Sequence, residues 1–164
     1  MRVEKDFEDL LKALNANNVN YCVVGAYAVM YYTCPRFTND MDVLIQSTPE
    51  NAKRAIKAIE DFGFVGTGAK PEDLLDRKKI FELGQPPVMV HITTKIDGLN
   101  DDEIWNNLEK GKYGATPVNY LGLEQLKRNK AVVAEKRSKS VDQTDHENLT
   151  VVERQGKSKK DIGG

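Results

Sequence analysis

The chain has 164 residues, of which 40% are hydrophobic, so it is long enough to form one domain around a buried core. Its 24 lysines and arginines are balanced by 25 acidic residues. This balance argues against a dedicated non-specific nucleic-acid-binding protein, which carries a basic excess. The two cysteines make no disulfide framework, and no apolar stretch approaches the ~20 residues that span a bilayer. The N-terminus also lacks the apolar core of a signal peptide. We therefore expect a soluble, cytoplasmic protein without a membrane partner.

Hydrophobic periodicity predicts alternating helices and strands in the first part of the chain. Short β-rich apolar runs predict buried strands, and apolar residues at helical spacing predict amphipathic helices. A hydroxyl residue followed by proline predicts a helix start, and glycine predicts a helix end. The predicted elements are a helix over 4–16, a strand ending at Gly25, a short helix over 26–33, a strand over 40–45, and a helix from Thr48–Pro49 to Phe62, followed by Gly63.

The second part of the chain predicts a hairpin and further helices. In chain order we expect a loop with one helical turn over 65–77, a hairpin of 78–83 and 88–93, a helix over 101–110, an extended segment over 113–121, a helix from 123 to about 134, and a last helix over 141–152. These elements predict an α+β fold, in which a mixed β-sheet is flanked by helices and followed by a C-terminal helical segment. We divide the chain into a core (1–120), a helical segment packed on it (121–153) and a flexible tail (154–164).

An acidic pair at the start of the second predicted strand carries the clearest functional signal. Asp40 and Asp42 are two residues apart, so in a strand their side chains point to the same face. Two neighbouring carboxylates repel each other unless a cation lies between them, and Mg²⁺ or Mn²⁺ suits such a pair. Upstream, the strand ending at Gly25 leads into a helix N-terminus, whose N–H groups favour a phosphate. This combination is typical of phosphoryl or nucleotidyl transfer.

The segment 23–45 (VVGAYAVMYYTCPRFTNDMDVLI) resembles the active-site signature of the nucleotidyltransferase superfamily, which has the DNA polymerase β-like fold. That signature is a glycine turn, a short helix, and an acidic pair on the next strand. The version here is similar to small bacterial minimal nucleotidyltransferase-like proteins, some of which act in toxin–antitoxin systems. The resemblance continues through 86–99 and the helical segment after 126, and so covers most of residues 5–150.

This resemblance implies roles for individual residues. Asp40 and Asp42 would be the catalytic metal ligands. The phosphate-facing turn would consist of Gly25 and Ala26, where the family often has serine or a second glycine. The remaining nucleotide-binding residues implied by the resemblance are Arg36, Thr38, Lys130 and Arg137. The substrate would be a nucleoside triphosphate, and the acceptor a hydroxyl group on a protein, an RNA or a small molecule.

The sequence departs from the family pattern at the third predicted catalytic position. There the family has a third carboxylate, and this chain has His91, which strand alternation places opposite Val90 and Ile92. An imidazole is a poor magnesium ligand, although it binds zinc or manganese and can act as a general base. Three outcomes stay open: a one-metal site with His91 as base, a site for a softer metal, or a site that binds without catalysis. Glu82 on the neighbouring strand is an alternative third acid.

Other residues have simpler interpretations. We expect Trp105 and the pair Tyr31–Tyr32 to pack in the core. Asp145 is expected to be a capping or a surface charge, and His146 to lie at the surface. Lys78 and Lys79 are either surface charges or phosphate ligands. The competing functions are a nucleotidyltransferase, a catalytically degenerate module that binds a nucleotide or a protein partner of a toxin–antitoxin type, and an unrelated enzyme with the same acidic pair, such as a glycosyltransferase or a phosphatase.

Overall fold

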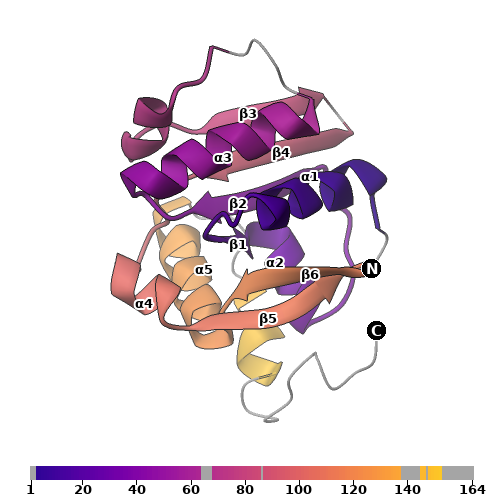
Figure 1. Ribbon diagram of the computed structural model, residues 1–164. Coiled ribbons are helices and arrows are strands. Elements are labelled where there is room, and N and C mark those ends of the chain that lie inside the picture. The colour runs from indigo at the N-terminus through magenta and orange to yellow at the C-terminus, as the bar shows by residue number, and fades with distance from the viewer. Residues whose placement is uncertain (1–2, 64–67, 86, 138–144, 147, 153–164) are drawn as a thin grey trace.

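A six-stranded mixed sheet forms the centre of the molecule, in the strand order β3-β4-β2-β1-β6-β5 (Figure 1). The computed structural model describes residues 3–63, 68–85, 87–137, 145–146 and 148–152. The elements in chain order are α1 (Lys5–Ala16), β1 (Tyr21–Val24), α2 (Gly25–Tyr32), β2 (Asp40–Ile45), α3 (Pro49–Phe62), the 3₁₀ helix η1 (Pro71–Leu75), β3 (Phe81–Gln85), β4 (Val88–Thr93), α4 (Asp101–Trp105), β5 (Leu108–Tyr113), β6 (Thr116–Leu121) and α5 (Leu123–Arg137). The predicted α+β class with a mixed sheet flanked by helices is confirmed.

The elements of the first part of the chain agree with the sequence prediction to within a residue. Helix α3 begins at the predicted cap, because the Thr48 hydroxyl accepts a hydrogen bond from the Asn51 backbone N–H at 3.3 Å. It ends at Gly63, whose φ of 119° lies in the region that favours glycine. The predicted helical turn after α3 is the 3₁₀ helix η1, and the predicted hairpin consists of β3 and β4.

One sequence prediction in the second part of the chain is wrong, and another is incomplete. The helix expected over 101–110 stops at Trp105, and Leu108–Tyr113 forms strand β5 instead. The extended segment expected after it is the second half of a β5–β6 hairpin that turns at Gly114, where φ is 60°. Strand β5 lies at the edge of the sheet, and its sequence LEKGKY has little apolar alternation. The helical spacing of Ile104, Trp105 and Leu108 therefore gave a misleading signal.

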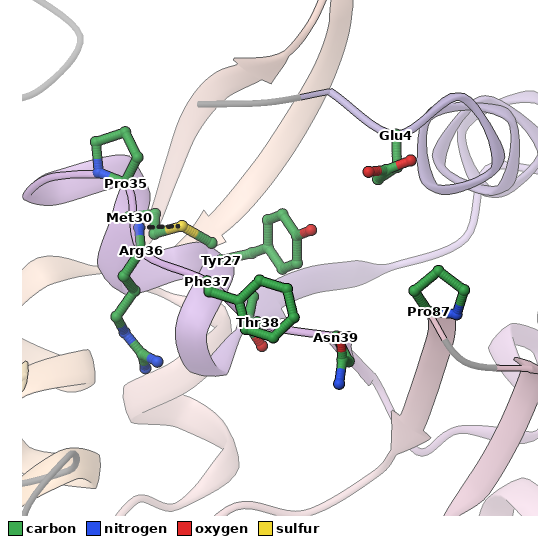
Figure 2. Close-up of a pocket in the computed structure, with 9 residues that line it drawn as sticks. All are labelled: Glu4, Tyr27, Met30, Pro35, Arg36, Phe37, Thr38, Asn39 and Pro87. Carbon is green, nitrogen blue, oxygen red and sulfur yellow. Dashed lines mark hydrogen bonds between the residues drawn. The ribbon is translucent and has the colours of Figure 1, made fainter.

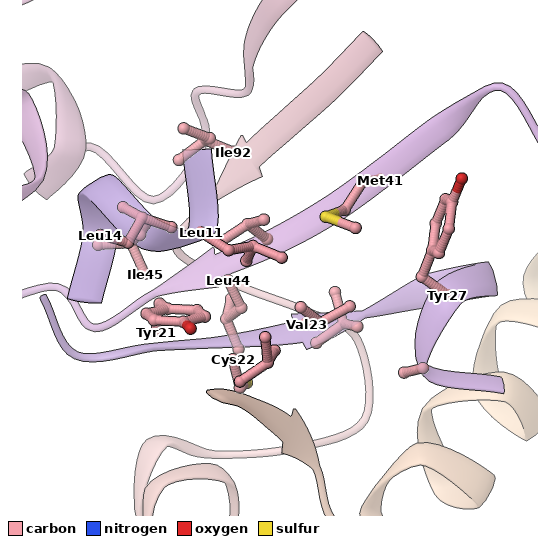
Figure 3. Close-up of a cluster of buried hydrophobic side chains, with 14 of the residues drawn as sticks. Leu11, Leu14, Tyr21, Cys22, Val23, Tyr27, Met41, Leu44, Ile45 and Ile92 are labelled. Atoms are coloured by element: carbon pink, nitrogen blue, oxygen red, sulfur yellow. The ribbon is translucent and has the colours of Figure 1, made fainter. Parts of the chain in front are cut away.

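The hydrophobic core lies between the sheet and the helices α1 and α3, which run side by side across one face. Figure 3 shows Leu11 and Leu14 of α1 packed near Met41, Ile45 and Ile92 of the central strands. These side chains have no more than 1% of their surface exposed. Their burial supplies most of the driving force for folding, since apolar surface is removed from water.

Aromatic side chains connect α2 to the β5–β6 hairpin. The rings of Tyr31 and Tyr120 stack with their centres 4.1 Å apart, and the Tyr32 hydroxyl donates a hydrogen bond to the Leu121 carbonyl at 2.8 Å. The expected core role of Tyr31 and Tyr32 is thus confirmed, and Trp105 packs partly buried against the core. These contacts fix the orientation of α2, whose first residue belongs to the candidate site.

Residues 145–146 and 148–152 are helical, in agreement with the expected last helix; its predicted start, 141–144, and the predicted tail lie outside the described residues. The division into a core of residues 1–120 and a helical segment stays a prediction. Within the described part of the chain, no helix combines the length and the apolar character needed to cross a membrane.

Candidate active site

The acidic pair lies on the face of the sheet that α1 and α3 do not cover. Strand β2 alternates between buried Met41 and Val43 and the partly exposed Asp40 and Asp42. Strand β4 runs parallel to β2 and alternates in the same way, which places His91 beside Asp42. The predicted orientation of the two aspartates and of the histidine is therefore present.

Asp42 lies directly against the glycine bend at the start of α2. Val24 at the end of β1 pairs with Asp42, so the next residue, Gly25, faces the carboxylate. A Cβ atom added to Gly25 would lie 2.2 Å from Asp42 Oδ2, and the φ of Gly25 is 65°. Both the backbone conformation and the close approach require glycine at this position. The bend and the acid, which are separated by the whole of α2 in the sequence, thus form one site.

His91 lies between two carboxylates. Its Nδ1 is 3.3 Å from Asp42 Oδ1, and its Nε2 is 3.7 Å from Glu82 Oε1. Glu82 reaches this position because β3 pairs with β4 in the register Glu82–His91. A proton taken up by the imidazole would lie between two negative groups, an arrangement that suits a general base. The structure therefore brings both candidates for the third catalytic position, His91 and Glu82, to the same place.

Burial dominates the electrostatics of Asp42, although His91 and Lys130 lie close to it. Burial raises the pKa of Asp42 above the ordinary value of a carboxyl group, and the neighbouring Asp40 raises it further. His91 and Lys130 act in the opposite direction, without cancelling the effect of burial. A bound cation would favour the ionised carboxylate in the same way as these two residues.

The two aspartates fit a divalent cation that is also held by its substrate. Mg²⁺ is usually bound through one or two carboxylates together with substrate phosphates. Among the residues that the structure describes, no cluster of three or more histidine, cysteine or acidic side chains is arranged to hold a metal ion. Asp40 and Asp42 are thus suited to a metal ion that a substrate phosphate also binds. They are not suited to a metal site in which the protein supplies all the ligands.

A buried acid from the C-terminal helical residues connects two of the predicted phosphate ligands. Asp145 is 2% exposed, and its Oδ2 lies 2.7 Å from an Arg36 guanidinium nitrogen and 3.3 Å from Lys130 Nζ. Of the two expected roles of Asp145, that of a surface charge is wrong, because these two cations make its burial favourable. Lys130 is itself 7% exposed and close enough to Asp42 to lower the pKa of that carboxyl group.

The other predicted site residues have different surroundings. Thr38 lies next to the acidic pair, where its hydroxyl is 3.4 Å from the Asp40 backbone nitrogen, and Ala26 is the second residue of α2. Arg137 is the last residue of α5, and its side chain lies outside the described residues. Lys79 pairs with Asp73 at 2.7 Å, which agrees with a surface role. His146 is half-buried.

A pocket of about 370 Å³ lies along the segment that enters β2 (Figure 2). Its lining residues come from the start of α1, from α2, from the segment between α2 and β2, and from the β3–β4 turn: Glu4, Tyr27, Met30, Pro35, Arg36, Phe37, Thr38, Asn39 and Pro87. Asn39 directly precedes Asp40, so the pocket lies next to the start of β2. The sequence analysis did not identify this pocket, since its walls come from four separate parts of the chain.

Solved structures of other proteins have folds similar to that of this chain. No family model matches the chain, and no curated protein matches it. Solved structures with a similar fold include the lincosamide antibiotic adenylyltransferase LnuA with bound lincomycin (16% identity, covering 91% of this chain and 97% of that one, TM-score 0.56). They also include the antibiotic-resistance factor ANT(2'')-Ia (12% identity, 96% and 92% coverage, TM-score 0.60). A third is an antigenic nucleotidyltransferase-like protein from Paracoccidioides brasiliensis (13% identity, 90% and 76% coverage, TM-score 0.59). The chain therefore has a nucleotidyltransferase-like fold.

Proposed function

We propose that this protein is a metal-dependent nucleotidyltransferase that transfers a nucleoside monophosphate from a nucleoside triphosphate to a hydroxyl group. The observation that carries the proposal is the contact between the Asp42 carboxylate and the Gly25 bend. This contact places a carboxylate next to a helix N-terminus that can bind phosphate, on a chain with a nucleotidyltransferase-like fold.

Each part of the site has a role in such a reaction. Asp40 and Asp42 would hold Mg²⁺ or Mn²⁺, which when bound neutralises charge on the triphosphate and lowers the pKa of the acceptor hydroxyl. The Gly25–Ala26 bend would contact the phosphates through its N–H groups. Lys130 would supply a buried positive charge close to Asp42. His91, supported by Glu82, would accept the proton of the acceptor hydroxyl.

Arg36 and Thr38 would position the triphosphate from the segment that enters β2, and Arg137 stays a prediction from the resemblance. Asp145 would act through Arg36 and Lys130 as a positioning residue, because it contacts both cations. The protein shares with LnuA an overall fold at 16% identity, so the acceptor of LnuA is not carried over to this chain.

A second candidate function is a nucleotide- or partner-binding module that has lost catalysis, as in a toxin–antitoxin pair. Two features favour it: the imidazole of His91 at the place of a third carboxylate, and Ala26, which supplies no hydroxyl for phosphate contact. The two functions differ in turnover and not in binding.

Radiolabel transfer from α-³²P-labelled nucleoside triphosphates, with Mg²⁺ or Mn²⁺ and a lysate as the source of acceptors, separates these candidates. The enzyme hypothesis expects labelled acceptor with wild type and none with Asp40→Asn. The variant His91→Asp restores the third carboxylate. Nucleotide binding without any label transfer by either wild type or His91→Asp would contradict the enzyme and favour the binding module.

A further inference from the structure

We propose that Met30 is a positioning residue of the candidate active site, because its sulfur holds the backbone of Arg36, a predicted triphosphate ligand. The inference rests on the proposed nucleotidyltransferase function and adds a residue to that site. Met30 acts through Arg36 and does not touch the substrate itself. A change at Met30 should therefore alter nucleotide binding more than it alters the stability of the fold.

The Met30 sulfur accepts a hydrogen bond from the Arg36 backbone N–H at 3.2 Å (Figure 2). A methionine in a core ordinarily fills space as an apolar side chain, and a thioether is a weak acceptor. Met30 is 4% exposed, so little water competes for this hydrogen bond, and a low local dielectric strengthens it. The side chain of Met30 therefore does more than pack the end of α2.

The segment that carries Arg36 has few other attachments to the rest of the protein. Residues 34–39 form neither a helix nor a strand, and the Phe37 ring next to Arg36 is 83% exposed. Within the described part of the chain, the hydrogen bonds that tie Arg36 to other elements go to the Met30 sulfur and to the Asp145 carboxylate. The first fixes the Arg36 backbone, and the second fixes its guanidinium group.

The guanidinium group of Arg36 is connected to the acidic pair through Asp145. The same Asp145 oxygen, Oδ2, lies 2.7 Å from an Arg36 nitrogen and 3.3 Å from Lys130 Nζ. Lys130 is in turn close enough to Asp42 to lower the pKa of that carboxyl group. Arg36 thus lies next to the lysine that neighbours the proposed metal ligand, where an arginine fork suits the oxygens of a triphosphate.

Helix α2 joins Arg36 to the glycine bend on the other side of the site. Gly25 is the first residue of α2, and Met30 lies in the last turn of the same short helix. The hydrogen bond to Met30 therefore fixes the Arg36 backbone relative to the bend that faces Asp42. Phosphates that contact both the bend and Arg36 bind more tightly when a rigid element holds these two groups in place beforehand.

Met30→Leu tests the proposal, because leucine has a similar volume but no acceptor, and such volume-conserving changes are well tolerated in cores. Met41→Leu is the matched control, since Met41 is 0% exposed and its sulfur has no hydrogen-bond partner among the described residues. Amide hydrogen exchange followed by NMR should be roughly tenfold faster at Arg36 in Met30→Leu and unchanged in Met41→Leu. Isothermal titration with ATP and Mg²⁺ should show a roughly three- to tenfold weaker affinity in Met30→Leu and wild-type affinity in Met41→Leu.

The same change in an Arg36→Ala background separates positioning from a general effect on the fold. Arg36→Ala should weaken ATP binding without abolishing it, because Lys130 and the glycine bend remain. In this background Met30→Leu should cause no further loss of ATP affinity, whereas a general effect on the fold would persist in full.

Four results with an ATP-binding wild type would overturn the inference. They are an unchanged exchange rate of the Arg36 amide in Met30→Leu, an unchanged ATP affinity in that variant, an equal loss of affinity in Met41→Leu, and an equal effect of Met30→Leu with and without the Arg36 side chain. Absence of ATP binding by wild type would instead contradict the proposed function, and the inference with it.

Discussion

The two faces of strand β2 differ over its first four residues, although they are built from alternate residues of one short segment. On one face Met41, Val43 and Ile45 are fully buried against the helices. On the other face Asp40 and Asp42 are partly exposed, and Asp42 lies against Gly25 and His91. The first face stabilises the fold by burying apolar area. The second face holds like charges close together, which costs stability and suits a cation.

Strand β2 therefore contributes both to the core of the fold and to the candidate site. A change on the apolar face should act on stability first, whereas a change on the acidic face should act mainly on binding. The following four predictions test where that separation holds and where it fails.

Gly25→Ala is expected to have the largest effect, because it disturbs both the bend and the acid. The new Cβ would overlap Asp42 Oδ2, and φ of 65° is unfavourable for alanine. We expect a loss of about 3–4 kcal/mol in the free energy of unfolding and no measurable nucleotide binding. Denaturant melts and isothermal titration with ATP and Mg²⁺ measure the two effects.

Gly68→Ala is the matched control, since its φ is 73° and an added Cβ there meets no atom within 4 Å. This variant should lose about 1 kcal/mol from the backbone conformation alone and bind ATP normally. Equal losses of stability and equal ATP binding in the two glycine variants would show that the contact between Gly25 and Asp42 contributes to neither.

Asp145→Asn should lower both the stability of the fold and the affinity for ATP. The change leaves Arg36 and the buried Lys130 without their shared carboxylate. We expect a loss of about 3 kcal/mol in the free energy of unfolding, because removing one partner of a buried ion pair is costly. The affinity for ATP should fall roughly tenfold as the two cations lose their positions.

The control for Asp145→Asn is Asp102→Asn, an exposed acid in the first turn of α4. Asp102→Asn should change neither the free energy of unfolding nor the affinity for ATP measurably. A positioning role also predicts partial rescue of ATP affinity by Asp145→Glu. An ATP affinity that is unchanged in Asp145→Asn, with a folded protein, would rule that role out.

Asp42→Asn should raise the stability of the fold and abolish metal-dependent ATP binding, so its effects on stability and on function have opposite signs. Burial raises the pKa of Asp42 in the folded state, so the folded protein holds a proton at this carboxyl group more tightly than the unfolded chain does. Its contribution to stability is therefore present below the ordinary carboxyl pKa and is lost as pH rises through the raised value. At pH 8 the neutral asparagine should raise Tm by roughly 2–4 °C over wild type, and this gain should shrink toward pH 4.

The same Asp42→Asn variant should not bind ATP in a metal-dependent manner, and wild-type binding should weaken as pH falls through the raised pKa of Asp42. Thermal melts over a pH series, with and without ATP and Mg²⁺, measure both trends. A lower Tm for Asp42→Asn at pH 8 would contradict the claim that this carboxylate is held at a cost to stability.

His91→Asp is expected to have the smallest effect on stability and the clearest dependence on metal. A third carboxylate next to Asp42 and Glu82 increases repulsion, which should lower Tm by a few degrees in a metal chelator. Added Mg²⁺ should recover that loss, because a cation compensates the repulsion. Thermal melts with EDTA and with Mg²⁺ check this, and His91→Asn serves as the uncharged control. If Mg²⁺ shifted both variants equally, the aspartates would not be a cation site.

The sequence predicted the fold class and most of the first half of the molecule, because there local signals and tertiary structure agree. The cap at Thr48 and the alternation in β2 are local patterns that packing does not override. The extended segment that contains β6 was predicted, but strand β5 was not, since Leu108 continues a helical spacing that its pairing with Leu121 overrides. Pairing between distant segments leaves no trace in local periodicity.

The candidate site, like the fold, was predicted in part from the sequence. The spacing of Asp40 and Asp42 and the upstream glycine were visible, and the structure brings Gly25 and Asp42 together. Their roles in metal and phosphate binding stay predictions. The burial of Asp145 was not visible, because its environment depends on Arg36, 109 residues earlier in the chain. The pocket was missed for the same reason, as its lining residues become neighbours after folding.

The pairing of Arg36 with Asp145 has a consequence for the order of events during synthesis. The ribosome releases β1, β2 and the glycine bend well before β6, which pairs in parallel with β1, and before the acid that neutralises the two cations. A nascent chain can therefore form its first helices and central strands before Asp145, the partner of Arg36, has been synthesised. Contacts between such distant segments form slowly because a long loop must close first. Competence for nucleotide binding would then arise late, near the end of translation.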